Sequence, residues 1–456
     1  MELKKNDIIE LNITAMSSEG SGIGRTQEGM AVFVPMSAIG DSLRVKLLKV
    51  KKTHAFGKIE EIISPSSDRI EPSCPVFRLC GGCVYSHITY EAEAKIKEQR
   101  VADAISRIGG IDTKINPIVS ADAPCRYRNK AQIPVGVSSD GLPAMGFFSR
   151  HSHRIIDSTD CELQPELFVT ASKILRDFIE DKNISVYNEE SHTGLVRHLY
   201  LRYGQVSGEL MVCIVVNGGK LPFEEELVGR FLQALPQVKS IILNSNTERT
   251  NVIVGKKFRT LYGSGYIKDT LCGLEFMLSP QSFYQVNHNQ AERLYALAKE
   301  YAQLKKTDVL MDLYCGTGTI GLSMARDCRE LIGVEVVPEA IEDAKKNAKA
   351  NGIENARFIC ADAAKAALEL KAQGVTPDVI VIDPPRKGCD SALIRTISEM
   401  SPQRVVYVSC DPATLARDLK LFAELGYETL EVTPVDMFPR TSHVETVARL
   451  YRKPLS

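Results

Sequence analysis

A cysteine that comes directly after an apolar strand is the residue of this sequence best placed for nucleophilic chemistry. Cys410 stands in the run Ser409-Cys-Asp-Pro, immediately after Val-Val-Tyr-Val. Ligands of open α/β sheets bind beyond the carboxyl ends of the strands, and a thiol at that edge is a candidate covalent nucleophile. A small core residue at a strand end would be the preferred interpretation for an arbitrary cysteine, but this position favours the nucleophile.

A glycine-rich turn upstream is typical of a nucleotide-like cofactor site. It lies in the run DLYCGTGTIG (312–321), where glycines between a strand and a helix let the backbone approach a ligand closely. The glycine spacing fits the dinucleotide fingerprint, and Glu335 stands where an acid would bind a ribose. Because a nicotinamide cofactor and S-adenosylmethionine both present a ribose, the turn alone leaves the two open.

A proline pair is expected to hold a carboxylate at the same edge of the sheet. Asp383 follows the strand DVIVI, and the two prolines after it form a rigid extended turn. Methyltransferases that act on amino nitrogens often carry an aromatic residue after such prolines, to stack on the target base. The residue here is Arg386, which argues against an amino-nitrogen target and suits a phosphate contact.

Near the C-terminus, the run SHVETV contains two groups that could accept a proton, His443 and Glu445. A carboxylate in a mostly apolar strand is either paired or functional. From the residues alone, both side chains remain candidates for a general base.

Clustered cysteines predict a metal site in the first third of the chain. Cys74, Cys80 and Cys83 lie close together, and Cys161 follows later. Two ligands at CxxC spacing with a nearby third indicate a bound metal, and four thiolates suit either zinc or an iron–sulfur cluster. Cys125 is a rival for the fourth position, and unligated thiols are the alternative interpretation.

These residues have to be positioned by three kinds of structure. In residues 3–62, apolar and polar side chains alternate at period 2 in short runs separated by glycine turns. This pattern predicts a small β-barrel of the OB type with a basic fourth strand. After a linker at 64–73, residues 74–275 mix a helix near 90–108 with strand-like runs, as in an α+β domain. From about residue 290 onward, apolar strands alternate with helices, which predicts a doubly wound parallel sheet.

One helix of the expected parallel sheet has recognisable ends. It follows the strand LIGVEV, with Pro338 suited to its first turn and Asn351-Gly352 suited to its end.

The composition limits the classes of protein to which this chain can belong. Hydrophobic residues make up 44% and charged residues 25%, as in an ordinary globular chain, and no apolar run approaches the roughly 18 residues of a membrane helix. We see no signal peptide, so a cytoplasmic location without a membrane partner is expected. The net charge is -1, but basic stretches at 43–58, 125–156 and 249–268 indicate a positive face toward RNA.

Taken together, these residues resemble the RNA uracil-C5 methyltransferase family, in its bacterial large-subunit ribosomal RNA branch. The resemblance rests on five motifs in this order: Ser282-Phe-Tyr-Gln285-Val-Asn287, the Asp312 glycine turn, Asp383-Pro-Pro-Arg, Ser409-Cys410-Asp-Pro and His443-Val-Glu445-Thr-Val. It implies a TRAM barrel at 1–62, a central α+β domain at 63–275 and a Rossmann-like S-adenosylmethionine-dependent domain at 276–456. It also implies that the helix near 90–108 packs on the catalytic domain.

The resemblance implies methylation of carbon 5 of a uridine in 23S ribosomal RNA, with S-adenosylmethionine as the methyl donor. Cys410 would add to carbon 6 of the uracil, because carbon 5 is not nucleophilic enough until that addition places electron density on it. Glu445 would then remove the carbon 5 proton, so that the thiolate can leave.

The remaining implied roles concern the cofactors. Gln285, Tyr314, Glu335 and Asp383 would line the S-adenosylmethionine site. The four ligands implied for a [4Fe-4S] cluster, which the family resemblance favours over zinc, are Cys74, Cys80, Cys83 and Cys161. The cluster is expected to be structural or to shape the RNA surface, because the methylation needs no electron.

Three alternatives remain: a transfer RNA uridine methyltransferase, a non-catalytic RNA-binding or ribosome-assembly protein, and a nicotinamide-dependent oxidoreductase. The barrel together with the cysteine cluster argues against the transfer RNA branch. The pair Cys410 and Glu445 argues against the other two, since neither needs such a pair. No obligate protein partner is inferred.

Overall fold

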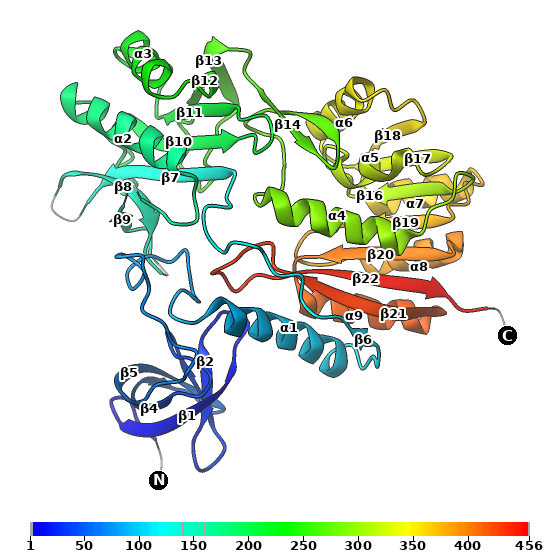
Figure 1. Cartoon of the computed structure of the whole chain (residues 1–456), viewed down its shortest axis with the longest axis horizontal. Helices are drawn as coiled ribbons and strands as arrows, with labels where there is room; N and C mark the ends of the chain where they lie inside the picture. The colour runs from blue at the N-terminus through cyan, green and yellow to red at the C-terminus, as the bar shows by residue number, and fades with distance from the viewer. Residues whose placement is uncertain (1–2, 139–140, 151, 159, 455–456) are drawn as a thin grey trace.

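The computed structural model of the chain describes residues 3–138, 141–150, 152–158 and 160–454. A barrel is built from the N-terminal strands, one large sheet from the middle of the chain and a second large sheet mainly from its C-terminal part (Figure 1).

The N-terminal strands close into a barrel in the order β1-β2-β3-β5-β4, which confirms the barrel predicted from the sequence. β3 and β5 pair in parallel, whereas β1 pairs antiparallel with both β2 and β4. Apolar side chains alternate with outward polar ones, so the inward set forms a closed core of leucine, isoleucine and valine. The strands are β1 (Ile8–Met16), β2 (Gly22–Arg25), β3 (Ala31–Val34), β4 (Ser42–Val50) and β5 (His54–Ser64).

The middle of the chain forms a seven-stranded sheet in the order β13-β12-β11-β10-β7-β8-β9. β11 and β12 are parallel, and the helix between them packs beside α2 against the sheet. The strands are β7 (Lys130–Val137), β8 (Pro143–Phe148), β9 (Ile155–Asp157), β10 (Val196–Tyr203), β11 (Leu210–Val216), β12 (Val238–Ser245) and β13 (Lys257–Gly263). The helices are α2 (Glu166–Asp181) and α3 (Glu224–Ala234). A two-stranded ribbon follows, formed by β14 (Ile267–Leu271) and β15 (Leu274–Leu278).

The C-terminal part forms an eight-stranded sheet in the order β18-β17-β16-β19-β20-β22-β21-β6. Its first five strands are mutually parallel, and β22 runs antiparallel to both of its neighbours. This is the doubly wound, Rossmann-like sheet that the alternating strands and helices predict. The strands are β16 (Val309–Leu313), β17 (Glu330–Glu335), β18 (Ala356–Cys360), β19 (Val379–Ile382), β20 (Arg404–Ser409), β21 (Tyr427–Val435) and β22 (Glu445–Arg452).

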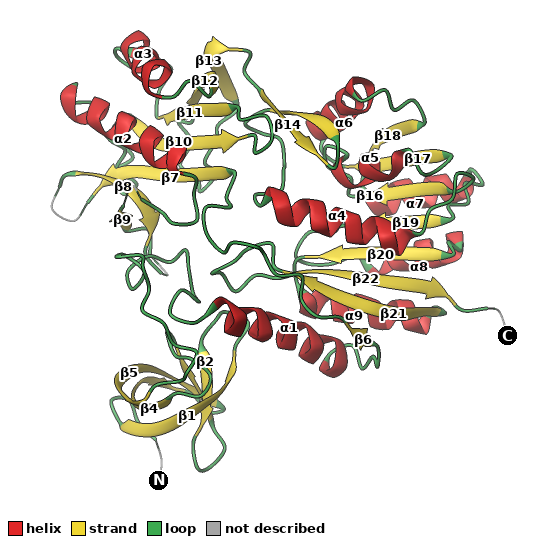
Figure 2. Cartoon of the chain, viewed as in Figure 1, coloured by secondary structure: helices red, strands yellow, loops and turns green. Residues whose placement is uncertain are grey.

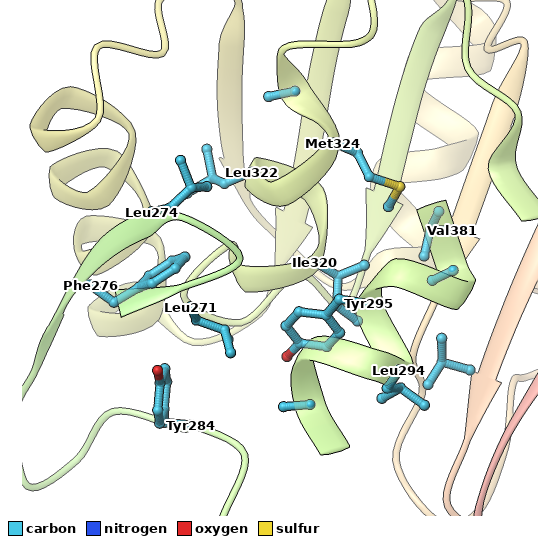
Figure 3. Packing of buried hydrophobic residues seen from close by; sticks show 14 of the residues in the cluster. Leu271, Leu274, Phe276, Tyr284, Leu294, Tyr295, Ile320, Leu322, Met324 and Val381 are labelled. Atoms are coloured by element: carbon cyan, nitrogen blue, oxygen red, sulfur yellow. The ribbon is translucent and has the colours of Figure 1, made fainter. Parts of the chain in front are cut away.

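Helices cover both faces of this sheet (Figure 2). Alternate residues of one strand point to opposite faces, so that Leu310 joins one buried layer and Met311 the other. In the first layer, Tyr295 of α4 meets Ile320 of α5 (Figure 3). The helices are α4 (His288–Ala302), α5 (Thr319–Ala325), α6 (Pro338–Ala350), α7 (Ala363–Ala372), α8 (Ser391–Met400) and α9 (Pro412–Glu424).

The predicted ends of α6 are those observed. Pro338 occupies its first turn, Asn351 caps its C-terminal end, and Gly352 follows with a positive φ of 62°.

Helix α1 (Tyr90–Arg107) follows the barrel in sequence but packs against α9 and β21. Its buried Val101 and Ile105 belong to the second apolar layer, and β6 (Lys114–Ile115) adds a short parallel strand at the sheet edge beside β21. The chain thus enters the C-terminal sheet before it builds the seven-stranded one.

None of the helices in the described part of the chain combines the length and the hydrophobicity that a bilayer crossing requires.

Candidate active site

The carboxyl ends of the parallel strands place the predicted site residues along one edge of the eight-stranded sheet. Tyr314 follows β16, Glu335 ends β17, Asp383 follows β19 and Cys410 follows β20. Glu445 reaches the same edge from the opposite chain direction, as the first residue of β22. β22 then runs away from this edge toward the C-terminus (Figure 1).

The register of two neighbouring strands brings the predicted nucleophile and the predicted base together. β20 and β22 pair antiparallel, and Ser409 lies opposite Thr446. The next residues outward are Cys410 on one strand and Glu445 on the other. They are close enough for the Glu445 carboxylate to raise the pKa of the Cys410 thiol.

The residues after Cys410 explain why the strand stops there and a helix begins. Asp411 caps α9, and its Oδ1 accepts hydrogen bonds from the backbone N–H groups of Ala413 (2.8 Å) and Thr414 (3.1 Å). Pro412 occupies the first turn, where its missing N–H costs nothing. Cys410 therefore lies directly before the N-terminal end of α9, whose dipole favours a thiolate.

In the free protein the Cys410 thiol is held in its neutral form. Burial, together with the carboxylates of Glu445 and Asp383, raises its pKa to about 11, and Arg386 opposes this rise. Only a small fraction is thiolate at neutral pH, so bringing a cation closer or moving a carboxylate away would activate it.

Glu445 is buried, with 5% of its surface exposed. Burial raises the pKa of its carboxyl to about 8, Asp383 adds to the rise, and Arg386 opposes it. His443 has the opposite shift, because burial and nearby cations lower its pKa to about 4. Once ionised, Glu445 is the stronger proton acceptor of the two.

Helix α9 also holds the loop that carries Asp383 and Arg386. The Thr414 hydroxyl donates to the Arg386 carbonyl (3.2 Å), and the carboxylate of Asp418 accepts the Cys389 N–H (2.8 Å). Burial raises the pKa of Asp383 to about 7. The position of the nucleophile and that of the neighbouring loop are thus set by one helix.

From the sequence, Arg386 is expected to contact a phosphate. The structure adds a second property, since this guanidinium is the cation that opposes the raised pKa values of both Cys410 and Glu445. Its place three residues after Asp383, at the same sheet edge, is the sequence signal that points to this role.

The glycine turn after β16 is closed by two carboxylates. Asp312 accepts the N–H of Gly321 (2.8 Å), and a Cβ at Gly321 would come within 2.6 Å of that carboxylate oxygen, so only glycine fits. Glu335 accepts the N–H of Gly316 (3.2 Å) through one oxygen and backbone N–H groups of its own loop through the other. Tyr314 adopts a left-handed φ of 68°, which turns the chain sharply at the strand end.

Gln285 is buried on a segment that links two parts of the fold. Its carbonyl accepts a hydrogen bond from the Asn129 amide (2.9 Å), and Asn287 caps α4 while its amide donates to the Met437 carbonyl (3.2 Å). Phe283 on the same segment is 63% exposed.

The predicted metal-binding cysteines line one cavity of about 480 Å³. Burial, together with the neighbouring thiols of Cys161, Cys80 and Cys74, raises the pKa of Cys83 to about 12. Cys125 also borders the cavity but is exposed.

In the described part of the chain, no three His, Cys, Asp or Glu side chains are arranged as a metal-ion site. The predicted cluster is therefore not shown. The four thiols still fit an iron–sulfur group. They line one cavity, and burial there raises the pKa of the Cys83 thiol, so thiolates would need a cation beside them.

Comparisons with known proteins place the chain among RNA-modifying enzymes. The profile of the tRNA (uracil-5-)-methyltransferase family matches residues 233–453, and that of the TRAM domain matches residues 2–59. An uncharacterized RNA methyltransferase of Halalkalibacterium halodurans is 46% identical over 99% of this chain and 98% of the relative. Another, of Staphylococcus aureus, is 44% identical over 98% of both chains.

A crystal structure of a Pyrococcus abyssi tRNA (uracil-54, C5)-methyltransferase, in complex with S-adenosyl-L-homocysteine, is similar over nearly the full length. It covers 97% of this chain and 100% of its own, with 28% identity and a TM-score of 0.77.

Replacing Arg386 with methionine should make the Cys410 thiol less reactive. Loss of the exposed cation raises the thiol pKa, so the thiolate fraction falls and alkylation by iodoacetamide at pH 8 should slow about threefold. Peptide-resolved mass spectrometry measures the modification of Cys410 itself. Arg395→Met, an exposed arginine on α8, is the matched control, and equal alkylation in both variants would contradict the electrostatic role.

Proposed function

This chain belongs to the RNA uracil-C5 methyltransferase family, and we propose that it methylates a uridine of 23S ribosomal RNA through Cys410 and Glu445. It is an S-adenosylmethionine-dependent enzyme of that family with a TRAM barrel, and its substrate is RNA. The observation that carries the proposed roles is the antiparallel pairing that puts Cys410 beside Glu445 at the sheet edge.

In the proposed reaction the Cys410 thiol first loses its proton to solvent, the thiolate sulfur bonds to carbon 6 of the uracil, and the π electrons move toward carbon 5. When bound, S-adenosylmethionine would supply the electrophilic methyl group: carbon 5 bonds to it while the methyl–sulfur bond breaks, leaving S-adenosylhomocysteine. Glu445 then takes the carbon 5 proton, the electrons of that bond re-form the double bond, and the carbon–sulfur bond breaks. Arg386 stabilises negative charge at the mouth of the site while sulfur or ring carries it.

Four side chains are proposed to hold the cofactor. Glu335 lies against the N–H of Gly316 in the glycine turn, where it suits the ribose hydroxyls. Tyr314 and Asp383 flank the same edge from neighbouring strands, and the shared position of these three residues at the strand ends supports their assignment. Gln285 lies on the segment before α4, and its assignment rests on the sequence resemblance.

The choice of 23S ribosomal RNA rests on the sequence resemblance to the ribosomal branch. A transfer RNA uridine is the second candidate, because the similar Pyrococcus abyssi protein is named a tRNA methyltransferase. That match spans 97% of this chain and so includes the barrel, which means the barrel does not separate the two RNA classes.

Transcripts that contain 5-fluorouridine should trap the protein on its true substrate. Fluorine on carbon 5 cannot leave as a proton does, so the covalent adduct persists on a denaturing gel. We expect an adduct with 23S ribosomal RNA in the presence of S-adenosylmethionine, none with transfer RNA, and none with Cys410→Ala. Trapping on transfer RNA alone would identify the second candidate as the substrate, and trapping by Cys410→Ala would refute the nucleophile.

The cysteine cavity is proposed to hold a [4Fe-4S] cluster through Cys74, Cys80, Cys83 and Cys161. Supporting this, burial of the Cys161 thiol raises its pKa, and the thiols of Cys80 and Cys74 raise it further, whereas Cys125 is exposed. The group would tie the segment 74–83 to residue 161, and the methyl transfer proposed above uses no electron from it.

Serine substitution should distinguish the fourth ligand from its rival. Anaerobically reconstituted protein is expected to be brown, with iron and sulfide in equal amounts, and Cys161→Ser should lose most of that iron. Cys125→Ser should keep it. Iron and sulfide analysis with visible absorbance measures both, while colourless protein that contains zinc would refute the cluster.

The barrel carries an aromatic face that suits unpaired bases. Phe33 of β3 stacks on Phe56 of β5 with ring centroids 5.5 Å apart, and His54 lies edge-on to both. The Lys51 ammonium lies 5.6 Å from the Phe56 ring, which is 38% exposed. Barrels of this topology bind oligonucleotides on the face that includes the third strand and the loop before the fifth, and aromatic side chains with nearby cations stack on bases without sequence preference.

The sequence contains no tryptophan, so Phe56→Trp creates a single fluorescent reporter on this face. Its emission should be quenched when single-stranded RNA is added at low salt, because a base stacks on the indole. Ile63→Trp, at the other end of β5 and 45% exposed, is the control and should respond little. Equal quenching of the two reporters would show that the aromatic face is not the contact.

A further inference from the structure

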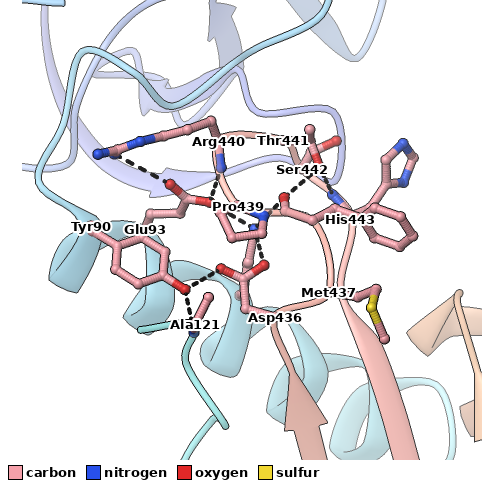
Figure 4. A network of polar contacts seen from close by, with 12 residues as sticks. Tyr90, Glu93, Ala121, Asp436, Met437, Pro439, Arg440, Thr441, Ser442 and His443 are labelled. Carbon is pink, nitrogen blue, oxygen red and sulfur yellow. Dashed lines mark hydrogen bonds and ion pairs between the residues drawn. The ribbon is translucent and has the colours of Figure 1, made fainter. Parts of the chain in front are cut away.

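The loop of residues 436–443 joins β21 to β22 and ends just before Glu445 (Figure 4). It is held largely by side chains of α1, although Lys97 of α1 and Asp436 of the loop are 339 residues apart in the sequence. Residues of α1 form hydrogen bonds along most of the loop. Contacts reach Asp436, Phe438, Arg440 and Ser442.

Lys97 is the centre of these contacts. Its ammonium donates to Asp436 Oδ1 (2.7 Å), to Glu93 Oε1 (2.7 Å) and to the Phe438 carbonyl (3.1 Å). These three bonds use all three of its N–H groups. Lys97 is 1% exposed and both carboxylates are fully buried, so neither acid has water as a substitute partner.

A hydroxyl group is the second partner of Asp436. The Tyr90 hydroxyl donates to Asp436 Oδ2 (2.8 Å) and accepts the backbone N–H of Ala121 (2.7 Å) (Figure 4). The carboxylate is therefore fixed through both of its oxygens, by two residues of the same helix.

The far side of the loop is tied to the cysteine segment. The Arg440 N–H donates to Glu93 Oε1 (2.7 Å), and its carbonyl accepts the N–H groups of Val84 (2.8 Å) and Tyr85 (3.2 Å), which directly follow Cys83. Arg440 has a φ of 70°, an unfavourable conformation for this residue type that these contacts hold in place.

The last anchor lies next to the site. The Arg100 guanidinium donates to the Ser442 carbonyl (2.6 Å). Only His443 and Val444 separate this carbonyl from Glu445, and Val444 is fully buried in the apolar layer that α1 shares with β22.

We infer that Lys97 is a positioning residue for proton removal: it holds this loop so that Glu445 enters β22 beside Cys410. The inference rests on the proposed role of Glu445 as the base. Without the ammonium, Asp436 loses its counter-charge and Glu93 keeps only the Arg440 guanidinium at 3.5 Å, so the two buried carboxylates repel each other and the loop moves. Other strands hold Cys410 and the strand ends that are proposed to bind the cofactor. Addition of the thiolate and methyl transfer should therefore continue, while release of the methylated RNA from Cys410 slows.

The test is single and multiple turnover of Lys97→Met, Lys97→Arg and Lys95→Met, with Glu445→Gln as the reference for loss of the base. Lys95 is exposed on the same helix and gives a matched change of charge. Tritiated methyl groups that remain bound to protein on a denaturing gel measure the methylated adduct.

We expect Lys97→Met to lower kcat at least tenfold with the KM for S-adenosylmethionine within twofold, and to accumulate the methylated adduct as Glu445→Gln does. Lys97→Arg should restore part of the rate because it keeps the charge, and Lys95→Met should behave as the unmodified protein. If the activity of Lys97→Met fell only in proportion to the fraction of folded protein, the methylated adduct would not accumulate, and the inference would be overturned.

Two further outcomes separate this inference from its premise. Normal turnover by Lys97→Met with slow turnover by Glu445→Gln refutes the positioning role alone, whereas normal turnover by Glu445→Gln refutes the base assignment and the positioning role with it. If Lys97→Met does not fold, Tyr90→Phe removes one hydroxyl from the same network. It should lower kcat about threefold with adduct accumulation, and an unchanged rate would overturn the inference.

Discussion

The antiparallel pairing of β22 with β20 is the constraint on which the active site depends. Five parallel strands bring only their carboxyl ends to the edge of the sheet, and residues at their amino ends lie at the opposite edge. A strand that runs the other way is needed to bring a residue from its own beginning to that edge. β22 does so, and its register with β20 leaves Glu445 as the next position beside Cys410. A slip of one residue would turn the carboxylate to the other face of the sheet.

Burial sets the chemistry of that edge as strongly as geometry does. Removal from water raises the pKa of Asp312, Asp383 and Glu445 together, to about 8, 7 and 8. Their charged forms are therefore costly in the free protein, and Arg386 is the nearby cation that offsets part of this cost for Glu445 and Cys410. Two further buried carboxylates, Asp436 of the 436–443 loop and Glu93 of α1, share the Lys97 ammonium as a direct partner. This ion pairing fixes their positions.

Segments from the first quarter and from the C-terminal part of the chain meet at the eight-stranded sheet. Helix α1 and strand β6 join the C-terminal sheet before the seven-stranded sheet is formed, so the loop that leads to Glu445 is gripped by residues from the first quarter of the sequence. The segment that follows Cys83 contacts the same loop at Arg440. The cysteine cavity and the loop before Glu445 are thus parts of one connected structure, although their sequences are far apart.

Local patterns were enough to predict much of this protein. Period-2 alternation predicted the barrel, because a strand buried on one face has an apolar side chain at every second position. Apolar strands alternating with helices predicted the doubly wound sheet, because strands buried on both faces are apolar throughout. The capping chemistry of Pro338 and Asn351 is local as well, and so is the place of Cys410 at a strand end. The catalytic, cofactor and cluster roles of individual residues remain predictions.

Only the tertiary structure could decide which distant residues meet. It shows that Cys161 is partly buried and lines one cavity with the other three thiols while Cys125 is exposed, that Glu445 lies beside Cys410, and that Lys97 anchors the loop before Glu445. These contacts depend on strand order, register and helix docking. They are settled by the packing of the whole chain, which leaves no short-range signal in the sequence.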